Sequence, residues 1–156
     1  MNHEEHALSL GKIIGNFHAL ESTLRIFLCE SNKEVFQFPE HGVTSMPETH
    51  LTNYDTLGTL IKKYNKQLAN TEQQFCIDPT LVDIRDAIAH GRVFSKTTGF
   101  PVDLFKFGVP KSGFVNVTFN QELNETWFKE ILASLRNHRD NIVKCAQLRK
   151  YPSFKS

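Results

Sequence analysis

The apolar residues of the N-terminal segment recur at helical spacing, and this pattern constrains the fold more than any other feature of the sequence. Between Glu4 and Cys29 they mostly stand three or four positions apart, which places them along one side of a helix. The residues of this stripe are Leu10, Ile13, Ile14, Phe17, Leu20, Leu24, Phe27 and Leu28. A helix of this length buries such a stripe against other elements, so the sequence predicts a helical protein with a substantial core.

Similar stripes predict a second helix and a last helix. The second is capped by Asp55 or a nearby residue, and its stripe comprises Leu57, Leu60, Ile61, Tyr64 and Leu68. The last helix is expected from about Gln121 to Arg149, with Asn120 or Asn124 as its cap. Its inner side is expected to carry Leu123, Trp127, Ile131, Leu135, Ile142 and Ala146.

A third helix is marked at both ends by residues typical of helix termini. Asp78 is a good N-cap, Pro79 suits the first turn, and Gly91 is typical of the position just after a helix. The inner stripe of this helix is expected to be Leu81, Ile84 and Ile88.

Between the third and the last helix the spacing changes from helical to alternating. The segments RVFS, VDLFKF and FVNVTF are rich in β-formers and are separated by glycine and proline. They predict a small antiparallel hairpin or a three-stranded meander at about residues 92–120. Two uses are open for Phe105 and Phe107, which have Lys106 between them: contact with a base or a partner strand, or capping of the core. The expected architecture is one domain over residues 1–156, a mainly α antiparallel bundle with this β insertion.

The net charge is +1, so the composition contains no overall basic excess that would require nucleic acid as a partner. The basic residues gather toward the C-terminus, however. They are Arg136, Arg139, Lys144, Arg149, Lys150 and Lys155, against Asp140 alone. This basic end is suited either to contact with phosphates or to a solvated helix surface.

The three cysteines stand far apart, at Cys29, Cys76 and Cys145, and form no CxxC pair. This spacing favours free thiols in a reducing compartment and no metal site. No apolar run approaches the roughly 20 residues that span a bilayer, and the charged N-terminal segment lacks a signal-type apolar core. We therefore predict a cytoplasmic protein without membrane association.

The third helix carries charged residues that its apolar stripe does not explain. Arg85 follows Leu81 by four positions, so it is expected to border the buried stripe and to need a partner. Glu21 is the obvious partner, because it too interrupts an apolar stripe. His90 follows Arg85 by five positions, about 140° around the helix and about 7.5 Å along it. The two side chains thus flank a strip of surface near the end of the helix, although a histidine there can also cap the last carbonyls.

These residue types suit the cleavage of RNA by its own 2′-hydroxyl. That reaction needs a base for the 2′-proton, an acid for the leaving 5′-oxygen and positive charge at the phosphate. Histidine can take either proton-transfer role near neutral pH. Arginine donates parallel hydrogen bonds to phosphate oxygens, so Arg85 and His90 together need no metal or other cofactor.

The segment RDAIAH, residues 85–90, resembles the R-x4-6-H motif of HEPN-domain proteins in its x4 form. The position after the arginine is usually Asn, Asp or His in that family, and Asp86 agrees. The setting is similar too, with a long first helix, the motif on a later helix and a long final helix. The resemblance covers about residues 4–95 and 120–150 and leaves the β insertion outside.

The resemblance implies a metal-independent endoribonuclease in which two copies of the motif face each other across a homodimer. Arg85 and His90 are the implied catalytic residues, with Asp86 in support. As the expected partner of Arg85, Glu21 could also orient the arginine for the phosphate. Many relatives are toxins or phage-defence effectors, held in check by an antitoxin partner. One branch carries a tyrosine two residues after the histidine as a regulatory site. Arg92 stands there in this chain, so we expect it to contact the RNA phosphate instead.

A second hypothesis comes from a different functional class. Other relatives with the HEPN fold lack nuclease activity, and fold alone does not establish catalysis. The chain would then be a non-catalytic helical module that binds a protein partner or a nucleotide, with Arg85 in a structural ion pair. It could equally be the inactive member of a toxin–antitoxin pair.

Overall fold

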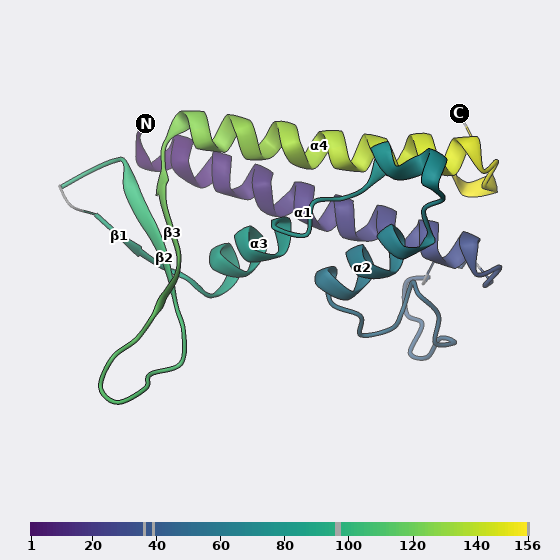
Figure 1. Ribbon diagram of the computed structural model, residues 1–156, viewed down its shortest axis with the longest axis horizontal. Helices are drawn as coiled ribbons and strands as arrows, with labels where there is room; N and C mark the ends of the chain where they lie inside the picture. Colours follow the sequence, from purple (N-terminus) through teal and green to yellow (C-terminus); the bar gives the residue numbers. More distant parts are fainter. Residues whose placement is uncertain (36, 39, 96–97, 156) are drawn as a thin grey trace. The chain divides into compact units, whose positions relative to one another are not determined.

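The computed structural model describes residues 1–35, 37–38, 40–95 and 98–155, and it is mainly helical with one small sheet (Figure 1). The elements in chain order are α1 (His3–Ser31), α2 (Leu57–Gln67), the 3₁₀ helix η1 (Asn70–Phe75), α3 (Leu81–His90), β1 (Arg92–Phe94), β2 (Val102–Phe107), β3 (Val117–Leu123), α4 (Glu125–Leu148) and the 3₁₀ helix η2 (Pro152–Phe154). The predicted class, mainly α with a small β insertion, is confirmed.

The chain divides into two compact units, and each is described by itself. Unit 1 comprises residues 1–17 and 80–134, and unit 2 comprises residues 18–79 and 135–156. Helices α1 and α4 each contribute residues to both units. The single domain expected from the sequence stays a prediction. Within the described residues, no helix offers an apolar stretch of the length that crossing a membrane requires.

The sheet of unit 1 is the predicted three-stranded meander, except that residues 96–97 of the insertion lie outside the described residues. Its strands pair antiparallel in the order β1-β2-β3, with Arg92 opposite Phe105 and Val102 opposite Leu123. Helix α3 contacts β2 and β3. The buried apolar residues of unit 1 are Ile13, Phe17, Leu81, Ala87, Val102, Leu104, Leu123, Trp127 and Phe128.

The start of the last helix was predicted four residues too early. Helix α4 begins at Glu125, and the Asn124 side chain caps it by accepting a hydrogen bond from the Trp127 N–H at 2.9 Å. Leu123, which the helical spacing placed on α4, is the last residue of β3 and is buried. Pairing with β2 provides hydrogen-bond partners for the backbone of this segment and buries Leu123. These tertiary contacts outweigh the helical spacing of the sequence.

The motif helix α3 is shorter than predicted, because residues 79–80 form a turn and the helix begins at Leu81. Thr80 stands at the N-cap position instead of Asp78. Gly91 follows the last helical residue as expected. The inner stripe differs, since Leu81 and Ala87 are buried whereas the predicted Ile84 and Ile88 are only half-buried.

Unit 2 buries the predicted stripe of α2, and the N-cap is Thr56, the neighbour of Asp55. Its buried residues also include most of the stripe predicted for α1 beyond residue 17. The core of unit 2 consists of Leu20, Leu24, Phe27, Leu28, Cys29, Leu57, Leu60, Ile61, Tyr64, Leu68, Phe75, Ile77, Leu135, Ile142, Cys145 and Ala146. Helical spacing therefore identified the core of this unit well.

The strongest ion pair of unit 2 joins Arg149 to Glu72. The Arg149 Nε donates to Glu72 Oε1 at 2.9 Å, Nη2 donates to the other carboxylate oxygen, and Nη2 also reaches the Gln67 carbonyl at 2.8 Å. The guanidinium lies over the Phe27 ring, 5.3 Å from its centroid. These hydrogen bonds lower the pKa of the Glu72 carboxyl to about 2. Arg149, part of the basic end of the chain, is thus engaged in the fold.

We expect Glu72→Gln to lower the free energy of unfolding by about 2 kcal/mol at neutral pH, because it removes charged hydrogen bonds to Arg149. A carboxyl whose pKa falls on folding stabilises the protein above its unfolded pKa, 4.5, and loses that contribution as the pH falls toward about 2. Urea denaturation at neutral pH and at about pH 3 should therefore show the gap between wild type and variant narrowing in acid.

Glu125→Gln is the matched control for this experiment. Glu125 pairs with Lys129 at 2.6 Å, but both side chains are about three-quarters exposed. Exposed pairs of this kind contribute little, so the control should change stability much less than Glu72→Gln does. Equal losses in the two variants, or a gap that does not depend on pH, would contradict the structural role of Glu72.

Candidate active site

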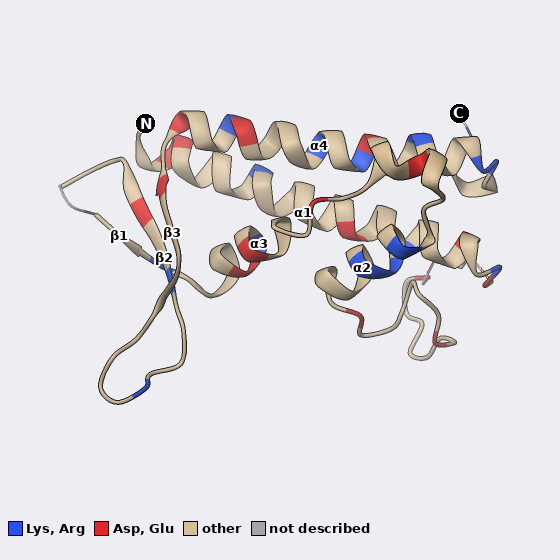
Figure 2. Cartoon of the chain, in the orientation of Figure 1, with Lys and Arg blue, Asp and Glu red and all other residues tan. Residues whose placement is uncertain are grey.

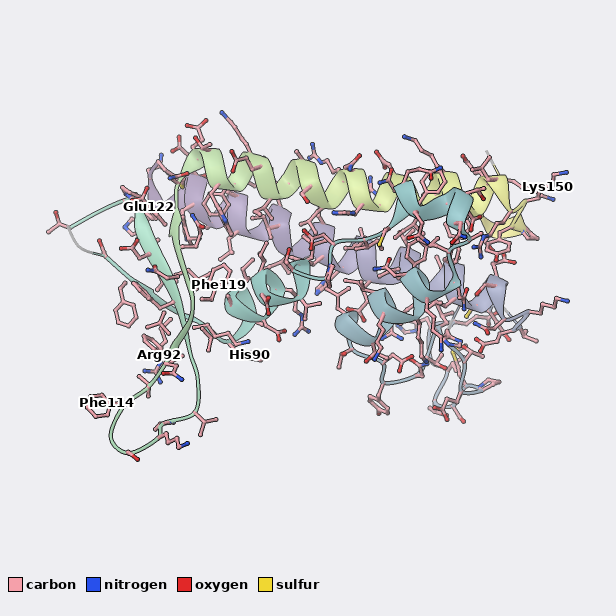
Figure 3. All side chains as sticks on the ribbon, viewed as in Figure 1. His90, Arg92, Phe114, Phe119, Glu122 and Lys150 are labelled. Carbon is pink, nitrogen blue, oxygen red and sulfur yellow. The ribbon has the colours of Figure 1, made fainter. Side chains whose placement is uncertain are left out.

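His90 is the last residue of α3, and its side chain is exposed. Figure 3 labels it beside the end of the helix, with Arg92 on the neighbouring strand. Within the described part of the chain, the imidazole makes no hydrogen bond or ion pair. The alternative role of capping the last carbonyls of the helix is therefore not observed. Both ring nitrogens are therefore accessible to a ligand.

Arg85 lies on α3 with 44% of its side chain exposed, so the prediction that it borders the buried stripe is wrong. Its Nη1 donates to Asp86 Oδ1 at 3.1 Å. The second oxygen of Asp86 lies 3.6 Å from the Lys106 Nζ on β2. Asp86 thus holds two cations on the same surface of unit 1. Lys106 was not among the predicted site residues, because only the pairing of the strands brings it close to α3.

Glu21, the predicted partner of Arg85, has a different partner within unit 2. It accepts hydrogen bonds from Arg25 Nε at 3.1 Å and Nη2 at 3.0 Å. Arg25 also donates to the backbone carbonyls of His50, Asn53 and Asp55. This pair therefore fastens the loop that precedes α2. Arg85 is paired with Asp86 instead, and the orienting role predicted for Glu21 has no support from these contacts.

Arg92 lies on β1, exposed, with its guanidinium 5.6 Å from the centre of the Phe107 ring. It is the residue that stands two positions after His90, where a phosphate contact is expected. A cation held over an aromatic ring is partly immobilised yet keeps its N–H donors available. Arg92 is thus oriented at the surface close to the end of α3.

Gly91 joins α3 to β1 through a close approach that only glycine permits. Its backbone is extended (φ −76°, ψ 176°), and its N–H donates to the Ala87 carbonyl at 2.7 Å. A Cβ at this position would lie 2.7 Å from Leu104 Cδ1 and 2.8 Å from the Phe105 carbonyl oxygen, and closer still to the Ala87 carbonyl oxygen. Any side chain would push the end of α3 away from β2. The position of His90 therefore depends on this glycine.

A hollow of about 380 Å³ in unit 1 lies away from these residues. It is lined by Met1, Glu5, Leu8, Ser9, Lys12, Glu125, Phe128, Lys129 and Leu132. Its charges are of mixed sign, and it contains none of the predicted site residues. Across the ranges that the structure describes, no three His, Cys, Asp or Glu side chains are grouped to hold a metal ion.

The surface around α3 offers groups that suit an anionic ligand. Arg85 has five N–H donors, one of which is engaged with Asp86. His90 has a free ring, and Arg92 adds a second exposed guanidinium. A guanidinium can donate hydrogen bonds to phosphate oxygens, and an imidazole can transfer a proton. Figure 2 shows how the charged residues are distributed over these elements.

Comparison with protein-family models, with curated proteins and with solved structures found no match for this chain. The chemistry of the exposed residues is therefore the basis for a functional proposal.

We expect Gly91→Ala to destabilise the protein by about 1–3 kcal/mol, because the added methyl group overlaps β2 and must displace the end of α3. Gly15→Ala in α1 is the control, since a Cβ there meets nothing within 4 Å. It should stabilise by about 0.5–1 kcal/mol through the higher helix propensity of alanine. Thermal unfolding of both variants checks this, and a neutral Gly91→Ala would contradict the close approach.

Proposed function

We propose that this protein is a metal-independent endoribonuclease of the HEPN type that acts as a homodimer. The observation that carries the proposal is the exposure of Arg85 and His90 on one short helix, the first with unused donors and the second without a partner. Arg25 and Arg149 of unit 2, by contrast, use their donors on glutamates and backbone carbonyls. An exposed arginine and an exposed histidine are the groups that RNA cleavage needs.

The reaction requires two proton transfers at one phosphodiester. One histidine takes the proton from the 2′-hydroxyl, and the 2′-oxygen attacks phosphorus. The bond between phosphorus and the 5′-oxygen then breaks, while a second, protonated histidine gives its proton to that oxygen. The products are a 2′,3′-cyclic phosphate and a 5′-hydroxyl. Arginine stabilises the charge that develops on the phosphate oxygens, and Asp86 positions Arg85 for this.

A single copy of the motif supplies only half of this machinery. It has one His90, whereas the reaction uses a base and an acid. Arg85 and His90 also point about 140° apart around α3, so they do not converge on one phosphate from the same side. Two copies of α3 facing each other would supply two histidines and two arginines. The exposure of this surface in the single chain supports such a composite site.

The resemblance of RDAIAH to the HEPN motif supports the same proposal and extends it. A HEPN-like helical bundle would place the motif helix at the dimer interface. A toxin or phage-defence effector held by an antitoxin is the biological role this implies, and the cytoplasm is the compartment. The three cysteines are free thiols, two of them buried, which agrees with a reducing environment.

A non-catalytic module that binds a protein partner is the second candidate. The hairpin between β2 and β3 favours it, because Val109 and Phe114 are 89% and 80% exposed. Figure 3 shows Phe114 on the loop that extends beyond the strands. Large apolar side chains at such a tip are typical of a surface that docks another protein. RNA cleavage, or its absence in a folded protein, separates the two candidates.

We expect purified wild type to cleave single-stranded RNA in the presence of EDTA and to leave 2′,3′-cyclic phosphate ends. His90→Ala should lower the rate by a factor of about 100 or more, as for loss of a general acid–base group. Because the His90 side chain is exposed and unpartnered, the melting temperature should not change. Gel analysis of the RNA, end-group analysis and thermal unfolding make the three measurements.

His18→Ala is the matched control, since His18 is also an exposed histidine on a helix. It should cleave like wild type. Arg85→Lys keeps the charge but loses the fork of donors, so we expect an intermediate loss of rate. Cleavage that survives in His90→Ala, or no cleavage by a folded wild-type dimer across several RNAs, would sink the nuclease proposal.

A further inference from the structure

One face of the sheet in unit 1 carries three phenylalanines and an arginine. Side chains alternate between the two faces of a strand, and residues paired across antiparallel strands share a face. Arg92 and Phe94 of β1 therefore lie on the same face as Phe105 and Phe107 of β2, because Arg92 is opposite Phe105. We call these four residues the aromatic face.

The rings of the aromatic face contact one another closely. Phe105 and Phe107 are nearly parallel, at 11°, with their centroids 6.1 Å apart. Phe94 meets both edge-on, at 5.7 Å and 6.4 Å. The Arg92 guanidinium lies over the Phe107 ring. The neighbouring rings hold one another in fixed orientations, which suits a surface on which a flat ligand stacks.

The aromatic face is not the face that forms the core. Val102, Leu104 and Leu123, on the opposite face, are buried. Phe94 is 47% exposed, and Phe105 and Phe107 remain half-buried. The sequence left two roles open for Phe105 and Phe107, contact with a ligand and capping of the core. The core is covered by Val102, Leu104 and Leu123 of the opposite face instead. The rings themselves remain in contact with solvent.

The two ends of the aromatic face carry opposite charges. Arg92 and Phe107 lie at the end where the chain leaves α3, two residues after His90. Two acids lie at the other end: the buried Asp103 of β2, opposite Phe94, and Glu122, opposite Asp103 on β3. A strand of RNA would place a phosphate toward Arg92 and keep its backbone away from Glu122. Two residues span at most about 7 Å, so a nucleotide on this face is within reach of the motif histidine.

We propose that the aromatic face is a stacking platform for the bases of single-stranded RNA, with Arg92 contacting the phosphate next to a stacked base. This rests on the proposed function, to which it adds the subsite that holds the substrate beside the composite site. Exposed aromatic rings beside arginine form sequence-tolerant platforms for unpaired bases, because every base has a π-face. The preorganised cation at the motif end favours RNA over an apolar partner protein.

Phe94→Ala tests the platform, because Phe94 is its most exposed ring. The probe is a short fluorescein-labelled oligoadenylate, and its affinity is measured by fluorescence anisotropy in a His90→Ala background so that no cleavage intervenes. We expect Phe94→Ala to weaken binding about fivefold or more, as for the loss of one stacked base. Phe94→Trp should bind at least as tightly as the background protein, since it keeps an aromatic surface.

Val93→Ala is the matched control. Val93 is 53% exposed on the same strand but faces the opposite way, so its removal should leave the affinity unchanged. The second probe is an oligomer of the same length whose sugars carry no bases. All variants should bind this probe equally, because only the base contact has been removed.

Equal affinities of Phe94→Ala and Val93→Ala for the oligoadenylate would overturn the platform. So would a Phe94→Ala protein that loses its dimer by light scattering while its RNA affinity stays the same, because the face would then be an interface between copies. The proposed function fails separately. Wild type that does not cleave RNA, together with base-dependent binding through Phe94, removes the nuclease and keeps the platform. If wild type cleaves RNA but Phe94→Ala does not change RNA binding, the nuclease proposal stands and the platform proposal fails.

Discussion

The close approach of Gly91 to β2 is the contact on which the chemistry of unit 1 depends. At this point the end of α3 lies so near Leu104 and the Phe105 carbonyl that only a hydrogen atom fits on the α-carbon. The residue before the glycine is His90, and the residue after it is Arg92. One steric constraint therefore fixes both the free imidazole and the guanidinium that lies over the sheet. Displacing α3 by the width of a methyl group would move the two apart.

The charged residues of the protein fall into two groups by how they are engaged. In unit 2, Arg25 and Arg149 each bond a glutamate and one or more backbone carbonyls. Such arginines are largely desolvated and their donors are used, so they stabilise the fold. In unit 1, Arg85 has one hydrogen bond to a neighbouring carboxylate, and Arg92 rests on an aromatic ring. The second group keeps donors for a ligand, which is why the proposed function is assigned to unit 1.

Helical spacing predicted the cores of α1 and α2 with few errors, because burial along a long helix follows the period of the backbone. The exceptions in α1 are Ile14, which is 39% exposed, and Leu10, which is half-buried. The prediction was weaker around α3 and the start of α4. Leu123 fits a helical stripe, yet it ends β3, because its pairing with Val102 is decided by a strand about twenty positions earlier. The short α3 buries Ala87 in place of Ile84 and Ile88, because the side of the helix that is buried is the one that packs against β2 and β3.

The sequence by itself determined the mainly helical class, the meander between the third and last helices, and the motif residues Arg85 and His90. These follow from spacing within a segment, which local backbone geometry converts directly into structure. Only the tertiary structure decided which charges meet. Glu21 and Arg25 stand four positions apart on α1, but Asp86 pairs with Lys106, and Glu72 with Arg149, across the chain. The partners in these last two pairs come from different segments of the chain. A single sequence does not show how far apart such residues lie in the folded protein. The exposure that leaves His90 free has the same origin.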